Sequence, residues 1–214
     1  MGFVVVAASP AAAEDAGGFY VGVRGTGSLA ELDSVNANGF AGSSNVQNDS
    51  DSNIGIGAVV GYRWQDIPLR TEIEGGYRFR FDFDAQDSGP PVTDYEVNIA
   101  TTTVLLNALL EWRNDTEFTP FVGGSVGWAR HSSDTSRVVI PTQAETSKTT
   151  DKDNLAWGVM AGVGWEFLDH WSAELAYRYT DLGEVDAGSF SGGDSLSADD
   201  YISHDLLLTV SYRF

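Results

Sequence analysis

The last eleven residues of the chain, HDLLLTVSYRF (residues 204–214), alternate polar and apolar side chains and finish on an aromatic residue. Alternation with a period of two is typical of a β-strand that has an apolar environment on one face and a polar one on the other. Chain ends are usually solvated and poorly ordered. This end therefore predicts a strand that stays in place up to its final residue, Phe214.

The same alternation recurs along most of the chain, in segments of roughly ten to twelve residues, the length that a tilted strand needs to cross a bilayer. In 54–64, 69–82 and 201–214 one face is mostly apolar and the other is mostly polar. We therefore predict strands at 18–29, 53–64, 69–83, 98–113, 119–130, 154–167, 171–182 and 201–214.

The connections between these strands alternate between short and long. The short ones are 65–68, 114–118 and 168–170, and the long ones are about 30–52, 84–97, 131–153 and 183–200. Successive connections of an antiparallel up-and-down barrel lie at opposite ends, so one end is trimmed and the other is elaborated. The predicted fold is all-β: a single eight-stranded antiparallel up-and-down transmembrane β-barrel with short periplasmic turns and four long external loops.

Four of the predicted strands share an ending in which one charged residue separates two apolar or aromatic residues. These endings are YRW (62–64), LEW (110–112), WEF (165–167) and YRF (212–214). The flanking residues point to the apolar face, as an aromatic girdle at a membrane interface requires. The predicted girdle consists of Tyr62, Trp64, Trp112, Trp165, Phe167, Trp171, Tyr212 and Phe214.

The charges within these endings point to the other face and predict an ion-pair layer inside the barrel. Over all strands, that face carries eight arginines against seven carboxylates, because Arg24, Arg70, Arg80, Asp82 and Asp205 lie on it as well. Charges confined in an interior must be paired, since an unpaired one costs several kcal/mol. The predicted lumenal ion-pair network consists of Arg63, Glu72, Glu74, Arg78, Glu111, Arg113, Glu166, Glu174, Arg178 and Arg213.

Composition excludes several classes of protein. The formal charge is −19, with 12 Lys and Arg against 31 Asp and Glu, which argues against nucleic acid as a partner. The chain has no Cys, so a disulfide framework and a thiolate metal site are excluded. No apolar run reaches the roughly 18 residues of a membrane helix. We predict no cofactor, no metal site and no catalytic residue.

The candidates for catalysis are few. They are HSS (131–133), the Asp199–Asp200 pair, and His204 beside Asp205. Neighbours on a strand point to opposite faces, so His204 and Asp205 should not form a dyad. The sequence has no nucleophile elbow and no two-His metal motif, which favours a non-enzymatic protein.

The N-terminus, MGFVVVAASPAAAED, has the features of an export signal. An apolar stretch runs from Phe3 to Ala8, Pro10 follows, and Ala11 to Ala13 form a small-x-small cleavage pattern. The basic residues that usually precede the apolar stretch are missing. We predict a truncated signal peptide at 1–13 and a barrel domain at 14–214.

Four stretches carry a resemblance to a known family: GGFYVGVRGTGS (17–28), TPFVGGSVGWA (119–129), LAYRYTDLG (175–183) and SHDLLLTVSYRF (203–214). They resemble the eight-stranded outer-membrane barrels of the opacity-protein and OmpA-like group. The resemblance implies a place in the bacterial outer membrane. It also implies that Tyr212 and Phe214 form the terminal signal that the barrel-assembly machinery reads. No periplasmic peptidoglycan-binding domain is expected after Phe214.

Members of this group range in role from envelope stability to adhesion. Eight strands enclose an interior that side chains can fill, and the predicted long loops carry most of the acidic excess. With the resemblance, we therefore expect a non-enzymatic barrel with a side-chain-filled lumen and acidic external loops. Its partners would be outer-membrane lipid and lipopolysaccharide, and a host or cell surface reached through the loops. The alternatives are a narrow passive or gated porin, a barrel hydrolase, and a soluble lipocalin-like barrel with its two faces inverted.

Overall fold

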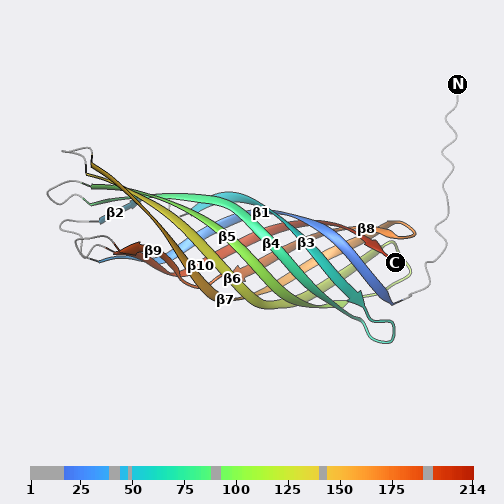
Figure 1. Cartoon of the computed structure of the whole chain (residues 1–214). Helices are drawn as coiled ribbons and strands as arrows, with labels where there is room; N and C mark the ends of the chain where they lie inside the picture. The colour runs from blue at the N-terminus through green and yellow to red at the C-terminus, as the bar shows by residue number, and fades with distance from the viewer. Residues whose placement is uncertain (1–16, 39–43, 48–49, 88–92, 140–143, 190–194) are drawn as a thin grey trace, which may run out of the picture.

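The computed structural model describes residues 17–38, 44–47, 50–87, 93–139, 144–189 and 195–214 (Figure 1). These residues form ten strands. The strands are β1 (Gly18–Asn38), β2 (Ser44–Gln47), β3 (Ser50–Arg63), β4 (Leu69–Asp87), β5 (Thr93–Glu111), β6 (Phe118–Val139), β7 (Ala144–Leu168), β8 (Trp171–Asp181), β9 (Val185–Ser189) and β10 (Ser195–Arg213). Within the described ranges, no helix has the length and apolar character that crossing a membrane requires. The predicted signal segment, 1–13, lies outside the described residues.

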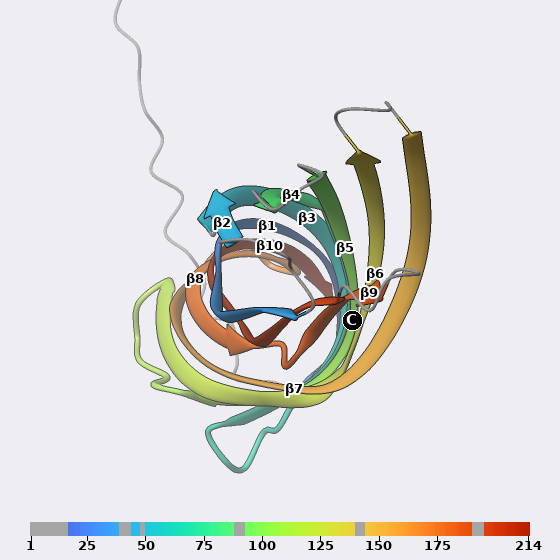
Figure 2. The same cartoon turned by 90° about the vertical axis from the view of Figure 1, so that its left-hand side faces the viewer.

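Eight of these strands form one closed antiparallel barrel, in the order β1, β3, β4, β5, β6, β7, β8 and β10. The barrel closes because β1 also pairs with β10, from Tyr20 opposite Arg213 to Asn38 opposite Ser195. The closed ring is visible along its axis in Figure 2. The predicted eight-stranded up-and-down barrel is confirmed. Outside the ring, β2 pairs with the end of β4, and β9 pairs with β10.

The strands are longer at one end of the barrel than the sequence indicates. β6 continues to Val139 and β7 begins at Ala144, so the predicted loop 131–153 is mainly a hairpin of paired strands. Likewise, β4 reaches Asp87 and β5 begins at Thr93. The predicted loop boundaries are wrong here, because the apolar alternation stops where a strand leaves the lipid while its backbone hydrogen bonds continue.

A β-bulge interrupts β4. Its pairing with β5 shifts by one residue between Arg78 and Phe81. A shift by one residue exchanges the two faces of a strand. The predicted unbroken alternation over 69–83 is therefore wrong beyond Arg78. Arg80 and Asp82, which that alternation assigned to the polar face, lie outside the described side chains.

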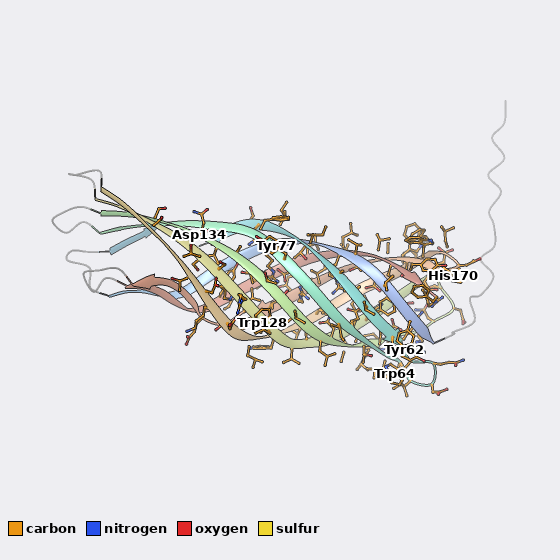
Figure 3. The ribbon with its side chains drawn as sticks, in the orientation of Figure 1. Tyr62, Trp64, Tyr77, Trp128, Asp134 and His170 are labelled. Atoms are coloured by element: carbon orange, nitrogen blue, oxygen red, sulfur yellow. The ribbon has the colours of Figure 1, made fainter. Side chains whose placement is uncertain are left out.

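The outer wall of the barrel is apolar and ends in two aromatic belts. The turn-end belt lies beside the short turns, and the far belt lies beyond the middle of the barrel (Figure 3). Exposed members of the turn-end belt are Trp64, Trp112, Trp165, Phe167, Trp171 and Phe214. Exposed members of the far belt are Tyr77, Phe79, Trp128, Trp157 and Tyr177.

The separation of the two belts fits a bilayer. On β7, Trp157 and Phe167 are ten residues apart, which is about 33 Å along the strand. With a strand tilt of about 40°, this corresponds to about 25 Å along the barrel axis. The apolar band of an outer-membrane barrel is also about 25 Å tall. The wall between the belts is therefore the part that fits a hydrocarbon layer.

This placement predicts that the cost of a charge on the outer wall depends on its depth. Leu208, midway between the belts on β10, is 57% exposed, and Leu29, beside the far belt, is 63% exposed. Leu208→Arg should lower the free energy of unfolding by about 2 to 4 kcal/mol, and Leu29→Arg by about 0 to 1 kcal/mol. Urea titration in lipid vesicles measures both. Equal losses at the two positions would contradict a lipid-facing wall.

Candidate functional site

The lumen contains two groups of charged side chains. The central cluster has four guanidinium groups and four carboxylates, so its formal charges cancel, and none of its residues is more than 6% exposed. The central cluster consists of Arg24, Arg70, Arg78, Arg178, Glu72, Glu74, Glu174 and Asp205. The turn-end cluster lies nearer the short turns and consists of Arg63, Glu111, Arg113, Glu166 and Arg213.

Glu74 holds the middle of the central cluster. Its Oε2 atom lies 2.5 Å from Arg24 Nη1 and 2.9 Å from Arg178 Nη1. Asn107 Nδ2 donates hydrogen bonds of 3.0 Å to both Glu74 and Glu72. Arg24 Nη2 also reaches Glu72, at 3.3 Å. Two arginines and one amide therefore satisfy two buried carboxylates. These contacts offset the free-energy cost of burying the two charges in a medium of low dielectric constant.

Three of the lumenal ion pairs connect strands that lie opposite each other in the ring. β4 and β8 have three strands between them in either direction, and so do β3 and β7. The three pairs are Glu74 with Arg178, Arg70 with Glu174, and Arg63 with Glu166. Side chains from opposite walls therefore meet across the barrel, and the lumen is crossed at three points along its length.

Asp205 anchors the far side of the central cluster. Arg78 Nη2 donates to Asp205 Oδ2 at 2.6 Å, and Arg178 Nε lies 3.4 Å from the same oxygen. The hydroxyls of Ser28 and Ser203 donate to Asp205 Oδ1 at 2.7 and 2.6 Å. Both carboxylate oxygens are thus satisfied, although no solvent reaches this residue.

Arg70 links the two clusters. It forms an ion pair with Glu174 and lies 3.5 Å from Glu111 of the turn-end cluster. Its guanidinium group sits between two aromatic rings, 5.6 Å from the centre of Tyr20 and 5.0 Å from that of Phe121. These distances are within the range of cation–π contacts. Arg70 is therefore held by charge and by ring contacts at once.

The Tyr20 ring occupies space that a glycine leaves free. Its atoms lie where a Cβ atom of Gly61 would be, so any larger residue at position 61 would displace the ring. The Tyr20 hydroxyl donates to Glu72 at 2.6 Å. Gly61 on β3 thus allows Tyr20 on β1 to reach the central cluster.

The turn-end cluster is centred on Arg63. Its Nε and Nη1 atoms lie 2.7 Å from Glu111 and 2.7 Å from Glu166. Arg213 and Arg113 complete the cluster at 3.4 Å from Glu166 and Glu111. The four charges of the repeated strand endings therefore meet at one level of the barrel. Arg113 also donates to the carbonyl oxygens of residues 64 and 65 and so holds a short turn.

All ten residues of the predicted lumenal network lie in these two clusters. The predicted network omits Arg24, Arg70 and Asp205, although the alternation assigned them to the same face. It also omits Asn107 and Tyr20, which the structure places in contact with the central cluster. The alternation of the strands could have placed Arg24, Arg70 and Asp205 in the network, since it assigns them to the inward face. The sequence does not mark Asn107 or Tyr20 in this way, because an uncharged polar side chain that points inward need not contact an ion pair.

The lumen also contains apolar side chains that the alternation does not predict. A buried apolar group lines it beside the charges: Leu109, Phe121, Met160, Ala176 and Leu207. In β5, VLLNALLE (104–111) is apolar on both faces, so the alternation does not separate inside from outside there. These apolar side chains pack beside the ion pairs of the central cluster.

The predicted girdle residues lie on the outer wall, beside the short turns. Tyr62 and Tyr212 are half-buried, and the other six are exposed. The ring centres of Tyr62 and Trp64 are 5.1 Å apart, and those of Tyr212 and Phe214 are 5.4 Å apart. Phe19 and Phe118 extend the belt, because their rings contact Tyr62 and Trp165.

The three catalytic candidates are not brought together. His131 is buried in the lumen, 2.9 Å from the Thr101 hydroxyl and 2.9 Å from the Leu182 carbonyl oxygen. His204 lies on the outer wall, 2.6 Å from the Tyr177 hydroxyl, while Asp205 points inward. The side chains of Asp199 and Asp200 lie outside the described ones. Among the described residues, no group of three or more His, Cys, Asp and Glu could hold a metal ion.

A small pocket opens at the turn end of the lumen. Its volume is about 40 Å³, and Arg63, Glu111, Glu166 and Arg213 are among the residues that line it. A water molecule needs roughly 10 to 15 Å³, so the pocket has room for a few. It ends at Arg70 and Glu174, where the central cluster begins.

A protein-family model covers nearly the whole chain. Residues 2–214 match the model of the outer membrane protein beta-barrel domain family. Outer membrane protein PagN of Salmonella typhimurium is 26% identical over 173 residues, which cover 75% of this chain and 72% of PagN. Opacity protein opA60 of Neisseria gonorrhoeae is 26% identical over 137 residues, 54% of this chain and 53% of that protein, so the chain spans about half of its length.

Solved structures share the fold. Neisserial surface protein A superimposes with a TM-score of 0.53 at 15% identity, over 92% of this chain and 97% of that chain. The resemblance drawn from the sequence motifs is confirmed by the family model and by these relatives.

The central cluster predicts a large stability difference between a buried and an exposed carboxylate. Glu74→Gln leaves Arg24 and Arg178 without their shared countercharge and should lower the free energy of unfolding by about 3 to 5 kcal/mol. Asp153→Asn breaks an exposed pair with Arg130, and solvent screening should make its effect small. Unfolding by urea in lipid vesicles compares the two. Losses of similar size would show that the lumenal charges are solvated rather than buried.

Proposed function

Because the chain belongs to the family of outer-membrane β-barrel proteins and resides in the bacterial outer membrane, we propose that it is a non-enzymatic barrel with a closed lumen. Its long hairpins serve surface interaction or envelope stability. The main support for this proposal is the contrast between the part of the barrel between the two belts and the part beyond the far belt. Ion pairs and apolar side chains fill the cross-section between the belts, while paired strands continue well beyond the far belt at one end only.

The closed lumen follows from the size of the barrel and from its contents. Eight strands enclose a space that side chains alone can fill. Glu74, Arg24 and Arg178 meet from three strands at distances of 2.5 and 2.9 Å, which leaves no room for an ion between them. The alternative is a gated pore, in which these pairs separate. The turn-end pocket supports that alternative, since it reaches as far as Arg70.

Conductance distinguishes the closed lumen from the gated pore. In planar bilayers, the unmodified protein should give no current steps. The double variant Arg24→Ala with Glu74→Ala should give them, because it removes the contacts in the middle of the lumen. The matched double variant Glu166→Ala with Arg213→Ala removes a pair of the turn-end cluster and should stay silent. Steps from the unmodified protein would support the gated pore and contradict the closed lumen.

The hairpins are the part of the molecule available to a partner. The β6–β7 hairpin is paired through to Val139 and Ala144, and β4 and β5 are paired through to Asp87 and Thr93. Exposed carboxylates on the described part of this end include Asp151, Asp153 and Glu184. Acidic hairpins at a cell surface stay solvated and extended. We place them outside the cell, as in other barrels with short periplasmic turns.

Replacing the hairpins tests the proposed division of labour. A variant in which short turns replace 30–52, 82–97, 133–152 and 184–200 should still insert, and its folded band should still shift on boiling in an electrophoresis gel. Bacteria that display it should lose adherence to cultured epithelial cells, or become sensitive to a chelator of divalent cations, relative to bacteria with the unmodified protein. Loss of insertion, or no change in either property, would contradict the proposal.

The remaining partners follow from the outer wall. The wall between the belts would contact outer-membrane lipid and, on the outer side, lipopolysaccharide. Tyr212 and Phe214, which contact each other at the end of β10, would present the terminal signal to the barrel-assembly machinery.

A further inference from the structure

One strand of the barrel wall continues far beyond its neighbour on one side. The β7–β8 ladder ends where Trp157 lies opposite Asp181. β7 continues beyond this point to Ala144, and over 144–156 it pairs with β6 alone among the described residues. Figure 2 shows the far ends of β6 and β7 reaching out past the other strands. The side of β7 that faces away from β6 is a free strand edge.

The free edge has a definite structural cause. After Asp181 the chain turns inward at Gly183, whose φ of 76° suits glycine. Leu182 is fully buried, and its carbonyl oxygen lies 2.9 Å from Nε2 of His131. Backbone hydrogen bonds of 2.9 Å then tie Leu182 and Gly183 to Tyr201 of β10. The chain therefore follows β10 and leaves β7.

β9 does not restore the missing neighbour. It pairs with β10, with Val185 opposite Ala198. It also contacts both β6 and β7, so it lies across the face of the hairpin rather than along its edge. Contacts with Glu184 reach only the lower part of the edge, through Lys152 at 3.0 Å and Asn154 at 2.5 Å. Residues 144–151 lie above these contacts and span about 26 Å.

The edge lies in water. Trp157 belongs to the far belt, and residues 144–151 lie six or more positions beyond it along β7. An unpaired edge exposes a row of backbone N–H and C=O groups, which an extended segment of another chain can pair with. The segment AETSKTTD (144–151) contains no proline that would block such pairing.

The side chains along the edge indicate the charge of the segment that fits. Ser147, Thr149 and Asp151 are exposed on one face of the strand, and the carboxylate of Asp153, the next exposed residue on that face, is paired with Arg130. This face offers two hydroxyls and the carboxylate of Asp151, and the whole chain carries a formal charge of −19. A second copy of the chain would bring the same negative charge to the contact, so the charge favours a cationic partner over self-association.

We propose that the edge of β7 over residues 144–151 binds an extended segment of a partner protein by strand addition, and that this segment is free of proline and carries Lys or Arg at alternate positions. Backbone hydrogen bonds supply the affinity, and the exposed carboxylate of Asp151 selects for basic side chains. This inference rests on the proposed surface function and names the chemistry of its partner.

Synthetic peptides test this directly on the full-length protein in lipid nanodiscs. The probe is a capped ten-residue peptide in which Lys alternates with Thr. The comparison peptides carry Glu in place of Lys, or one Pro at the centre. The Lys peptide should bind, and it should slow amide hydrogen exchange over 144–151. The Pro peptide should bind about tenfold more weakly, because proline interrupts the ladder.

A matched pair of variants separates the edge from general attraction to a negative protein. Asp151→Lys, on the edge, should weaken binding of the Lys peptide about tenfold, because it reverses a charge at the contact. Asp115→Lys makes the same change in net charge in a turn at the opposite end and should leave binding unchanged. Equal effects of the two variants, or binding without protection of 144–151, would overturn the proposal.

Three further outcomes are decisive. Concentration-dependent dimerisation of the unmodified protein with protection of 144–151 would show that a second copy occupies the edge, which overturns the cationic partner. If the hairpin-replacement variant loses adherence while the Lys peptide fails to bind the unmodified protein, the strand-addition proposal fails and the surface function stands. If the Lys peptide binds as expected while hairpin replacement changes neither adherence nor chelator sensitivity, the surface function fails instead.

Discussion

The structure depends on ion pairs between opposite walls of the barrel. A carboxylate or guanidinium group enclosed in a narrow lumen has lost most of its water, and a nearby opposite charge is what makes its burial tolerable. Glu74 with Arg178 and Arg63 with Glu166 provide that charge from strands on opposite sides of the ring. The same contacts fix how the opposite walls face each other. The ion pairs therefore balance the charge of the lumen and hold the closed ring together at the same time.

This constraint explains the inverted distribution of side chains. Arginines and glutamates occupy the positions that a soluble protein gives to its core, and the exposed wall carries residues such as Ile73 and Leu208. The apolar side chains of the lumen, with Leu109 and Phe121 among them, pack beside the ion pairs, and the Phe121 ring contacts the Arg70 guanidinium. Under the proposed function, these contents close the membrane-embedded part, and contact with a partner falls to the hairpins beyond the far belt.

The hairpins owe their shape to the barrel below them. Two neighbouring strands separate above Trp157 because Leu182 turns into the lumen, where His131 holds its carbonyl oxygen. His131, a catalytic candidate in the sequence, therefore has a structural role: it holds the turn that leaves the edge of β7 free. The interior and the outward surface are connected by this one change of direction in the backbone.

The sequence by itself determined the number of strands in the ring, their order, the face that meets lipid and the endings at the short turns. These features follow from period-two alternation, since lipid requires an apolar outer face wherever a strand crosses it. The tertiary structure decided the rest. The extension of β6 to Val139, the bulge after Arg78 and the place of Asn107 between Glu72 and Glu74 depend on contacts between distant segments. No alternation marks them, because water and a filled lumen accept polar and apolar residues alike.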